Sequence, residues 1–572
     1  MKKTEYRGVW ESFFQMLYKS NLPYGLMILT LLISMMNSWV GLQLPDMVAS
    51  LVNSVTHGGM MSIFLMGMAQ LVLTIGALIS KTYAQILIDR NMQRQMADKI
   101  FYLKMSDIEK RDPREMVSRV TTDTKLLSAL LLTITVDELP RLYYMVGALV
   151  KIYRNYDTTL GIVLLVSVPV TLLGSWIVGK LTFGKAEALQ AAISRLTARI
   201  GEKVNNMSVI KSYNSQEKES ESGEQVILDL EKNLRKKAVI DRIGATATTL
   251  VTLIPTVAVI SVGAALVLSG KVETVTFVAY YGLAGTFIGH VVAHMTLWIS
   301  IKNAQGATWR ISQILRQPDE LVEETRSGQE GSISFVDVCK SFGDNKVLDH
   351  VSFTLEAGKK TALVGYSGSG KSTVLNLLEQ FYRPDSGEIL MGGVPVTEWD
   401  IQSYRNNFTY VPQNAPGFSG TIRELLTYGE EAQLSDEELW KVVDQVGARA
   451  FVELLGGLDY EVGNNAEKLS GGQKQKLCIA RAMTRPKEIM LLDEATSALD
   501  VKATEQIQSL LDQLMLGKTM ILVAHNLATV KNADKIIVFD EGRVIAEGTH
   551  QELMAGCAHY RELAAATGGR EA

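Results

Sequence analysis

The stretch Gly365-Tyr366-Ser367-Gly368-Ser369-Gly370-Lys371-Ser372-Thr373 decides the fold of the second half of the chain. An apolar run, residues 361–364, precedes it, and a helical pattern, residues 374–378, follows it. A buried strand, a glycine-rich turn and a helix in this order direct backbone N–H groups and the positive end of the helix dipole at one point, where phosphate oxygens can bind. Lys371 would reach the β- and γ-phosphates, and the Ser372 hydroxyl would bind Mg²⁺. The stretch therefore predicts a phosphate-binding loop.

Composition indicates that part of the chain lies in a membrane. The 572 residues are 47% hydrophobic and 21% charged, and a chain of this length needs more than one core. The net charge of −4 argues against a nucleic-acid partner, because such domains are usually strongly basic. Three cysteines, Cys339, Cys478 and Cys557, have the spacing of neither a zinc site nor a disulfide framework, so we expect reduced structural thiols.

Six apolar runs are long enough to cross a bilayer, which takes about twenty residues. They cover residues 22–44, 60–88, 127–153, 159–178, 243–268 and 275–301. Short polar turns separate the members of each pair, whereas residues 89–125 and 180–242 are long, charged and helical in pattern. The sequence predicts six membrane helices, several of which continue far beyond the bilayer.

Positive charge fixes the orientation of these helices. Lys and Arg concentrate in residues 1–20, 89–125 and 180–242, so the positive-inside rule places all three segments in the cytoplasm. Residues 1–20 lack the pattern of a cleaved signal peptide. Lys151 and Arg154 lie near an outer turn and run against the rule, but their side chains could snorkel to the headgroups.

Ionisable residues inside the apolar runs allow two interpretations. Asp137, Glu138 and Arg141 lie early in the third run, and His290 and His294 share one face of the sixth. An ionisable group costs about 2.5–3.5 kcal/mol at the bilayer centre. These residues form a polar wall of a substrate cavity, or else the first three belong to a cytoplasmic extension and the histidines pair between helices.

The chain divides into four parts by composition. Residues 1–20 are an N-terminal cytoplasmic segment, 21–315 a transmembrane domain, 316–331 a polar linker and 332–572 a nucleotide-binding domain. In the last part, short strands at 332–338 and 347–355 precede alternating helical and strand patterns with buried strands at 489–492 and 520–523. The fold class is a membrane all-α six-helix domain followed by a soluble α/β P-loop ATPase domain.

Four further residues turn the phosphate loop into a hydrolytic site. Asp493 ends an apolar strand and would hold Mg²⁺, and Glu494 would polarise the attacking water, a contribution of about 10²–10⁴-fold. His525 ends the following strand and would contact the γ-phosphate. Gln413 follows another strand and would touch Mg²⁺ and sense the γ-phosphate. Together these residues predict an ATPase.

At Leu469-Ser470-Gly471-Gly472-Gln473 the sequence resembles the ATP-binding cassette transporters, and the resemblance covers almost the whole chain. It is similar to the exporter-type half-transporters, in which one six-helix domain precedes one cassette. The resemblance adds a further motif, Ser497-Ala498-Leu499-Asp500. It also places a first coupling helix in the region Asp107–Thr124, within Pro113–Arg119, and a second near Ser212–Glu217; both would carry motion from the cassette to the spans.

In that family the signature of one cassette closes over the ATP of another, so the resemblance implies a dimer. Ser470, Gly471, Gly472 and Gln473 begin a helix and offer a second anion-binding helix end. Phe342 matches the aromatic that stacks on adenine, or else it is a core strand residue. The implied cofactors are ATP and Mg²⁺, with Ser372, Gln413 and Asp493 as the metal-binding residues.

We therefore expect an ATP-driven transporter in a bacterial cytoplasmic membrane, which exports an amphipathic compound, lipid or peptide by alternating access. The alternative is an importer on the same scaffold, for instance for siderophores. A homodimer is expected because the predicted catalytic residues are present, and a heterodimer remains open. A gated channel is a further alternative, and it would be detected as an ion current. The residues that contact the substrate do not follow from one sequence.

Overall fold

The computed structural model describes residues 9–53, 57–320, 331–429, 434–496, 501–524 and 530–568. The chain forms two compact units: Met1–Phe101 with Asp112–Gln317, and Tyr102–Arg111 with Pro318–Ala572. The first unit is helical and the second is α/β. The predicted fold class, an all-α membrane domain followed by an α/β domain, is confirmed.

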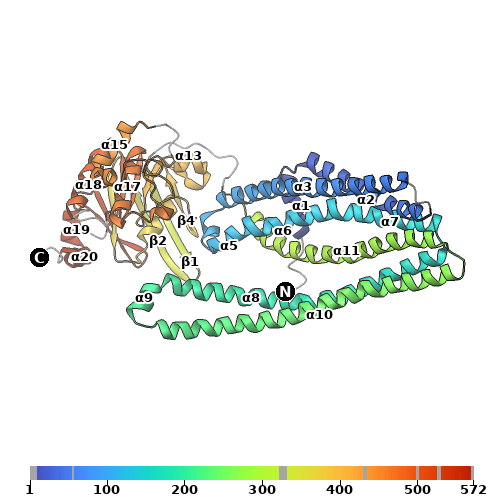
Figure 1. Ribbon diagram of the computed structural model, residues 1–572. Helices are drawn as coiled ribbons and strands as arrows, with labels where there is room; N and C mark the ends of the chain where they lie inside the picture. The colour runs from blue at the N-terminus through green and yellow to red at the C-terminus, as the bar shows by residue number, and fades with distance from the viewer. Residues whose placement is uncertain are drawn as a thin grey trace. The chain divides into compact units, whose positions relative to one another are not determined.

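Long helices dominate the first unit, and Figure 1 shows α8 and α10 running side by side. The helices are α1 (Val9–Lys19), α2 (Tyr24–Asn53), α3 (His57–Phe101), α5 (Pro113–Ser118), α6 (Thr124–Leu132), α7 (Leu139–Asn155), α8 (Thr158–Asn205), α9 (Met207–Ser212), α10 (Gln216–Leu268) and α11 (Thr274–Leu315). Wider π-helical turns at Arg119–Asp123 and Thr133–Glu138 join α5, α6 and α7 into one path.

The lengths of these helices confirm the expected extensions. Helices α3, α8 and α10 contain 45, 48 and 53 residues. At 1.5 Å per residue they extend roughly 65–80 Å, more than twice the thickness of a hydrocarbon core. In the described part of the chain, four helices have the length and apolarity of a membrane span: Tyr24–Ser50, Met60–Phe101, Gln216–Leu268 and Thr274–His294. A shorter apolar stretch covers Thr158–Gly174, and the third expected run falls on α6 and α7.

The helical unit has an apolar core with polar ties. Tyr144, Leu164, Tyr280 and Phe287 are buried together, and the hydroxyl of Tyr280 donates to the carbonyl of Leu160 at 2.8 Å. The buried carboxylate of Asp123 accepts a hydrogen bond from Arg119 in the same π-helical turn at 3.3 Å. It also accepts one from Nε of Arg310 on α11 at 2.9 Å, which links this turn to α11. These contacts join helices that are far apart in the sequence.

Two sheets form the second unit. The larger has the order β10-β9-β3-β8-β7-β6, parallel except for the β9–β10 hairpin, and the smaller is antiparallel with the order β2-β1-β4-β5. The strands are β1 (Ile333–Phe342), β2 (Asn345–Leu355), β3 (Lys360–Gly365), β4 (Ser386–Met391), β5 (Val394–Pro395), β6 (Phe408–Val411), β7 (Ile489–Asp493), β8 (Thr519–Val523), β9 (Lys535–Asp540) and β10 (Arg543–Gly548).

Helices surround the larger sheet and complete the core. They are α12 (Lys371–Leu378), α13 (Ile401–Arg405), α14 (Ile422–Leu426), α15 (Asp436–Gln445), α16 (Arg449–Leu455), α17 (Gly471–Thr484), α18 (Val501–Leu514), α19 (His550–Gly556) and α20 (Ala558–Gly568). Strands β3, β7 and β8 are buried on both faces, as expected of a parallel sheet covered by helices. The carboxyl ends of these strands, where ligands bind in such sheets, carry the predicted site.

A short segment from the first half of the chain folds with the α/β unit. Tyr102–Arg111 contains α4 (Met105–Ile108), and the amide of Glu320 donates to the carbonyl of Tyr102 at 2.8 Å. The hydroxyl of Tyr382 bonds to the carboxylate of Glu109. The expected coupling helix at Pro113–Arg119 forms α5, which Asp112 caps and which belongs to the helical unit. Residues 107–111 of the region expected to hold the coupling helix thus fold with the α/β unit, and the coupling role stays a prediction.

Two glycines with positive φ test how tightly the smaller sheet is packed. Gly387 and Gly393 have φ of +79° and +81°, but a Cβ on Gly387 would lie 2.2 Å from the carbonyl oxygen of Asp337, whereas one on Gly393 would meet nothing within 4 Å. Gly387→Ala should lower the apparent melting temperature by about 5–10 °C, against about 2–4 °C for Gly393→Ala, which only strains φ. Thermal unfolding of the full chain in nanodiscs measures both. Equal shifts would contradict the tight packing at Gly387.

Candidate ATP site

Glycines shape the turn between β3 and α12. Gly365 has φ +155°, and a Cβ there would lie 2.3 Å from the carbonyl oxygen of Phe539 on β9. Gly370 has φ +103°, and a Cβ there would lie 2.6 Å from Leu348 Cδ2 on β2. Neighbouring strands therefore hold both ends of the turn so closely that only glycine fits. The predicted phosphate loop thus has a rigid backbone.

Lys371 lies inside this loop, with only 5% of its surface exposed. Its ammonium donates to the carbonyls of Gly365 at 2.9 Å and Tyr366 at 2.7 Å, and to the hydroxyl of Ser369 at 3.2 Å. Burial lowers the pKa of Lys371, and the nearby carboxylates of Glu494 and Asp493 oppose that shift. A buried cation whose hydrogen-bond acceptors all belong to its own loop can accept the oxygens of a phosphate.

Hard oxygen ligands lie beside the loop. Asp493 is buried at the end of β7, and the Ser372 hydroxyl lies 3.4 Å from its Oδ1. A carboxylate and a hydroxyl in this arrangement match the preference of Mg²⁺ for oxygen. The structure therefore brings together Lys371, Ser372 and Asp493, which lie far apart in the sequence.

Gln413 and Glu494 meet next to this pair. Nε2 of Gln413 donates to Oε2 of Glu494 at 2.7 Å. Glu494 adopts φ +48°, a strained conformation for a residue other than glycine, and its amide donates to the carbonyl of Val523 at 3.1 Å. The backbone is held so that the side chain leaves the end of β7 on the phosphate side. His525 and Ser497–Asp500 lie outside the described residues.

Phe342 ends β1 and is 40% exposed, so it is not a core residue. Its ring contacts Tyr382 edge-on, with centroids 4.9 Å apart, and the ammonium of Lys340 lies 5.6 Å from the ring centre. An aromatic ring with this much exposed surface can stack on a flat ligand. Sequence reasoning missed Tyr382, because nothing in its local sequence indicates this contact.

The signature residues lie at the start of α17. Ser470 caps the helix, accepting from the amide of Gln473 at 3.3 Å, while the side chain of Gln473 accepts from the amide of Ser470 at 2.8 Å. Ser470 and Gly471 are exposed, and a Cβ on Gly471 would meet nothing within 4 Å. This helix N-terminus is therefore preformed and open to an anion from outside the chain.

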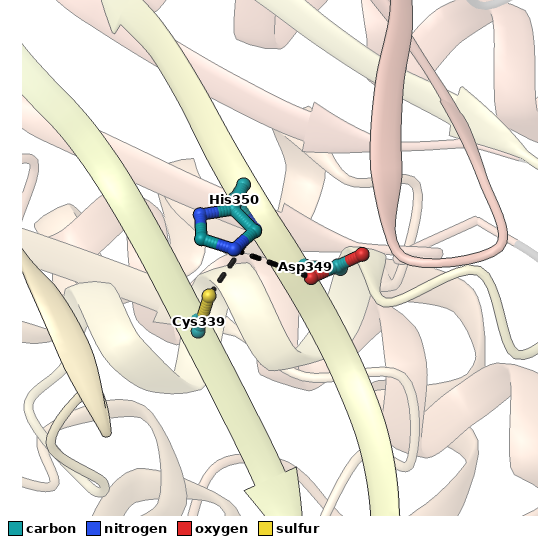
Figure 2. Close-up of side chains that lie close together, drawn as sticks. All are labelled: Cys339, Asp349 and His350. Atoms are coloured by element: carbon teal, nitrogen blue, oxygen red, sulfur yellow. Dashed lines mark hydrogen bonds and ion pairs between the residues drawn. The ribbon is translucent and has the colours of Figure 1, made fainter.

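A second cluster lies on the β1–β2 hairpin, where Figure 2 shows Cys339 and Asp349 turned toward the ring of His350. The three ligand atoms lie within 4.8 Å of one another. However, Lys346 and Arg543 both form ion pairs with Asp349, and Nδ1 of His350 bonds to Asp337 at 2.7 Å. Since the carboxylate already has two cationic partners, we assign this cluster a structural role in the hairpin.

Comparison with known proteins agrees with this geometry. Residues 24–291 match the family described as ABC transporter transmembrane region, and residues 348–497 match the family described as ABC transporter. The chain is 30% identical over 546 residues to a multidrug resistance ABC transporter ATP-binding and permease protein of Lactococcus lactis subsp. lactis, covering 93% of this chain and 91% of the relative. The chain belongs to the ABC transporters.

Further similarities support the same assignment. An ATP-dependent lipid A-core flippase of Bordetella avium is 31% identical over 481 residues, covering 82% of this chain and 81% of that protein. The solved structure of a bacterial Atm1-family ABC exporter with ATP bound superposes with a TM-score of 0.83, at 22% identity and over 96% of this chain and 99% of that one. This ABC transporter therefore hydrolyses ATP to drive transport, and it spans the membrane several times.

Replacing Glu494 tests the geometry next to the phosphate loop. Glu494→Gln keeps the shape of the side chain but removes its charge, so we expect ATP hydrolysis to fall about 10²–10³-fold while ATP binding is retained. Glu488→Gln is the matched control, because Glu488 precedes β7 and pairs with Lys518 at 3.1 Å. Hydrolysis and nucleotide binding by purified protein in nanodiscs measure both. A normal rate with Glu494→Gln would exclude Glu494 as the base.

Proposed function

We propose that this ABC transporter is an exporter half-transporter that moves an amphipathic compound, lipid or peptide out of a bacterial cytoplasm. The proposal rests on two groups of residues that would together make a hydrolytic site. Lys371 and Asp493 form a phosphate and metal cradle in one place, while the preformed end of α17 at Ser470 is open to an anion. The residues that would hold ATP and those that would close over it thus belong to different elements, the loop before α12 and the start of α17.

In the proposed cycle, ATP binds with its adenine against Phe342 and its phosphates in the loop at Gly365–Thr373. Mg²⁺ would be held by Ser372 and Asp493, with Gln413 beside it. Glu494 would then polarise the attacking water and His525 would contact the γ-phosphate. The hydrogen bond from Gln413 to Glu494 supports this, because an arriving metal and γ-phosphate would compete for both side chains.

A dimer would complete two such sites. The signature of each chain would close over the ATP of its partner, and closure would shift the membrane helices from inward- to outward-facing. A homodimer is self-sufficient, because each chain has Lys371, Glu494 and Ser470. A heterodimer with a related chain would use the same contacts.

Relatives and charge support the direction of transport. The names of the relatives describe multidrug resistance and lipid A flipping, and neither favours the importer alternative. The positively charged stretches at 89–125 and 180–242 would place the cassette in the cytoplasm, where ATP is available. We therefore propose export from the cytoplasm or from the inner leaflet.

Gly471→Asp tests whether the signature acts on the ATP of a second chain. The new side chain meets open space in its own chain, so the fold should be kept, but its negative charge would repel the phosphates held by the partner. We expect ATP hydrolysis to fall at least about tenfold with unchanged ATP binding and melting temperature. Gly556→Asp, also exposed to open space at a helix end, at the end of α19, is the control. A normal rate with Gly471→Asp would contradict the composite site.

Inverted membrane vesicles test the direction. For an exporter, adding ATP outside such vesicles should drive substrate into the lumen, with accumulation abolished in Glu494→Gln. Candidate amphipathic drugs, lipids and peptides would first be screened by stimulation of ATP hydrolysis in nanodiscs. ATP-dependent accumulation in right-side-out vesicles loaded with ATP would instead support an importer.

A further inference from the structure

Arg405, the last residue of α13, joins three segments of the α/β unit. Its guanidinium donates to both carboxylate oxygens of Glu320, from Nη1 at 2.9 Å and from Nη2 at 2.8 Å. Its Nε donates to the carbonyl of Glu379 at 2.9 Å, and Nη2 also reaches the carbonyl of Gln380 at 3.4 Å. The centre of the guanidinium lies 5.2 Å from the centre of the Phe381 ring. One side chain therefore connects α13, the end of α12 and the segment that follows α11.

The pair of Arg405 and Glu320 has the features of a fixed contact. Both side chains are mostly buried, with 27% and 20% of their surfaces exposed. A guanidinium that bonds to both oxygens of a carboxylate fixes the orientation of the two groups, whereas a fully exposed ion pair contributes little. On its other side the guanidinium meets the carboxyl end of α12, where the helix dipole favours a cation. Arg405 is therefore held from two sides.

Glu320 lies where two membrane helices enter the α/β unit. It follows the end of α11, and its amide donates to the carbonyl of Tyr102, the residue after the end of α3, at 2.8 Å. Asp319 and Leu103 form an antiparallel bridge beside this bond. The segments that leave α11 and α3 are therefore bonded to each other at the residue that Arg405 holds.

The other two segments that Arg405 contacts or extends lead to the ATP site. Helix α12 begins at Lys371 of the phosphate loop, and Arg405 binds at its far end. Strand β6 follows α13, and its parallel pairing with β7 places Gln413 and Glu494 at the same edge of the sheet. Arg405 precedes β6 and thus lies toward the opposite end of that strand. A helix and a strand that both carry ATP-site residues at one end are therefore joined through Arg405 at the other.

We propose that the Arg405–Glu320 pair transmits changes at the ATP site to the membrane helices, with both residues as positioning residues. A displacement of α12 or β6 on ATP binding would move Arg405, and the two-point contact would pass that movement to Glu320. The main chain would carry it on to α3 and α11. The inference goes beyond the proposed export, because it applies to either direction of transport.

Hydrogen exchange of the full-length Glu494→Gln protein in nanodiscs, with and without ATP, tests the proposal. If ATP binding opens the outer ends of the membrane helices, exchange at the outer turn, residues 269–273, should rise at least about threefold. Glu320→Gln removes the charge but leaves the bonds from Arg405 to α12 in place. We expect this variant to lose most of the rise, while its ATP affinity and the ATP-dependent protection of the phosphate loop stay within about twofold.

Glu547→Gln is the matched control. Glu547 on β10 pairs with Lys535 at 2.6 Å, and both side chains are exposed to a similar extent as those of the Arg405–Glu320 pair. This variant should keep the full rise. Its melting temperature, compared with that of Glu320→Gln, shows whether loss of the rise follows stability alone.

Two variants of Arg405 separate transmission from a structural role. Arg405→Lys keeps the charge but loses the two-point contact, so it should keep part of the rise. Once Arg405→Gln has been introduced, adding Glu320→Gln should reduce the rise no further, because the pair acts as one unit. Additive losses in the double variant would contradict transmission through this contact.

The outcomes also separate this inference from the proposed export. A full rise in Glu320→Gln would overturn the inference, and so would an equal loss in Glu547→Gln. Weakened ATP binding in Glu320→Gln would overturn it too, because Glu320 would then act on the nucleotide site itself. If ATP causes no rise in the Glu494→Gln parent, the pair transmits nothing and the inference fails. Accumulation in inverted vesicles tests the direction of transport independently of all these results.

Discussion

The buried ammonium of Lys371 is the interaction on which the rest of the cassette depends. Removing a charge from water is costly unless acceptors replace the water, and the loop supplies two carbonyls and a hydroxyl for this purpose. That arrangement requires a sharp turn, and the turn requires glycine where β2 and β9 come within contact distance of Gly370 and Gly365. The sheet order around β3 is therefore part of the phosphate site.

In the proposed dimer, each chain would supply one half of each site. Lys371, Asp493 and Glu494 converge at the ends of β3 and β7, but the helix end at Ser470 lies at the surface with its capping bonds already made. A preformed helix N-terminus attracts anions, and an unused one at the surface favours association with a partner that carries phosphates. ATP between two cassettes would then act as the contact that holds them together.

The parts of the site that could be predicted from sequence are those that local chemistry determines. The residues from Gly365 to Thr373 and the pair Asp493-Glu494 each occupy a strand end, and strand ends in a parallel sheet meet at one edge. The contacts of Tyr382 with Phe342 and Glu109, and of Lys81 with Asp137, could not be predicted, because they join segments separated by long stretches of chain. The grouping of residues 102–111 with the α/β unit could not be predicted for the same reason, because it is a tertiary contact.

In both halves of the chain the cations are paired with oxygen acceptors, but the acceptors differ in charge. In the cassette, Lys371 is satisfied by neutral acceptors, which phosphate oxygens can replace because an ionised acceptor binds a cation more strongly. In the membrane domain, Lys81 pairs with Asp137 and Arg141 pairs with Glu138, so both cations are already matched by ionised acceptors. A new anion would gain less there than a phosphate gains at Lys371, because it would compete with carboxylates rather than with neutral carbonyls.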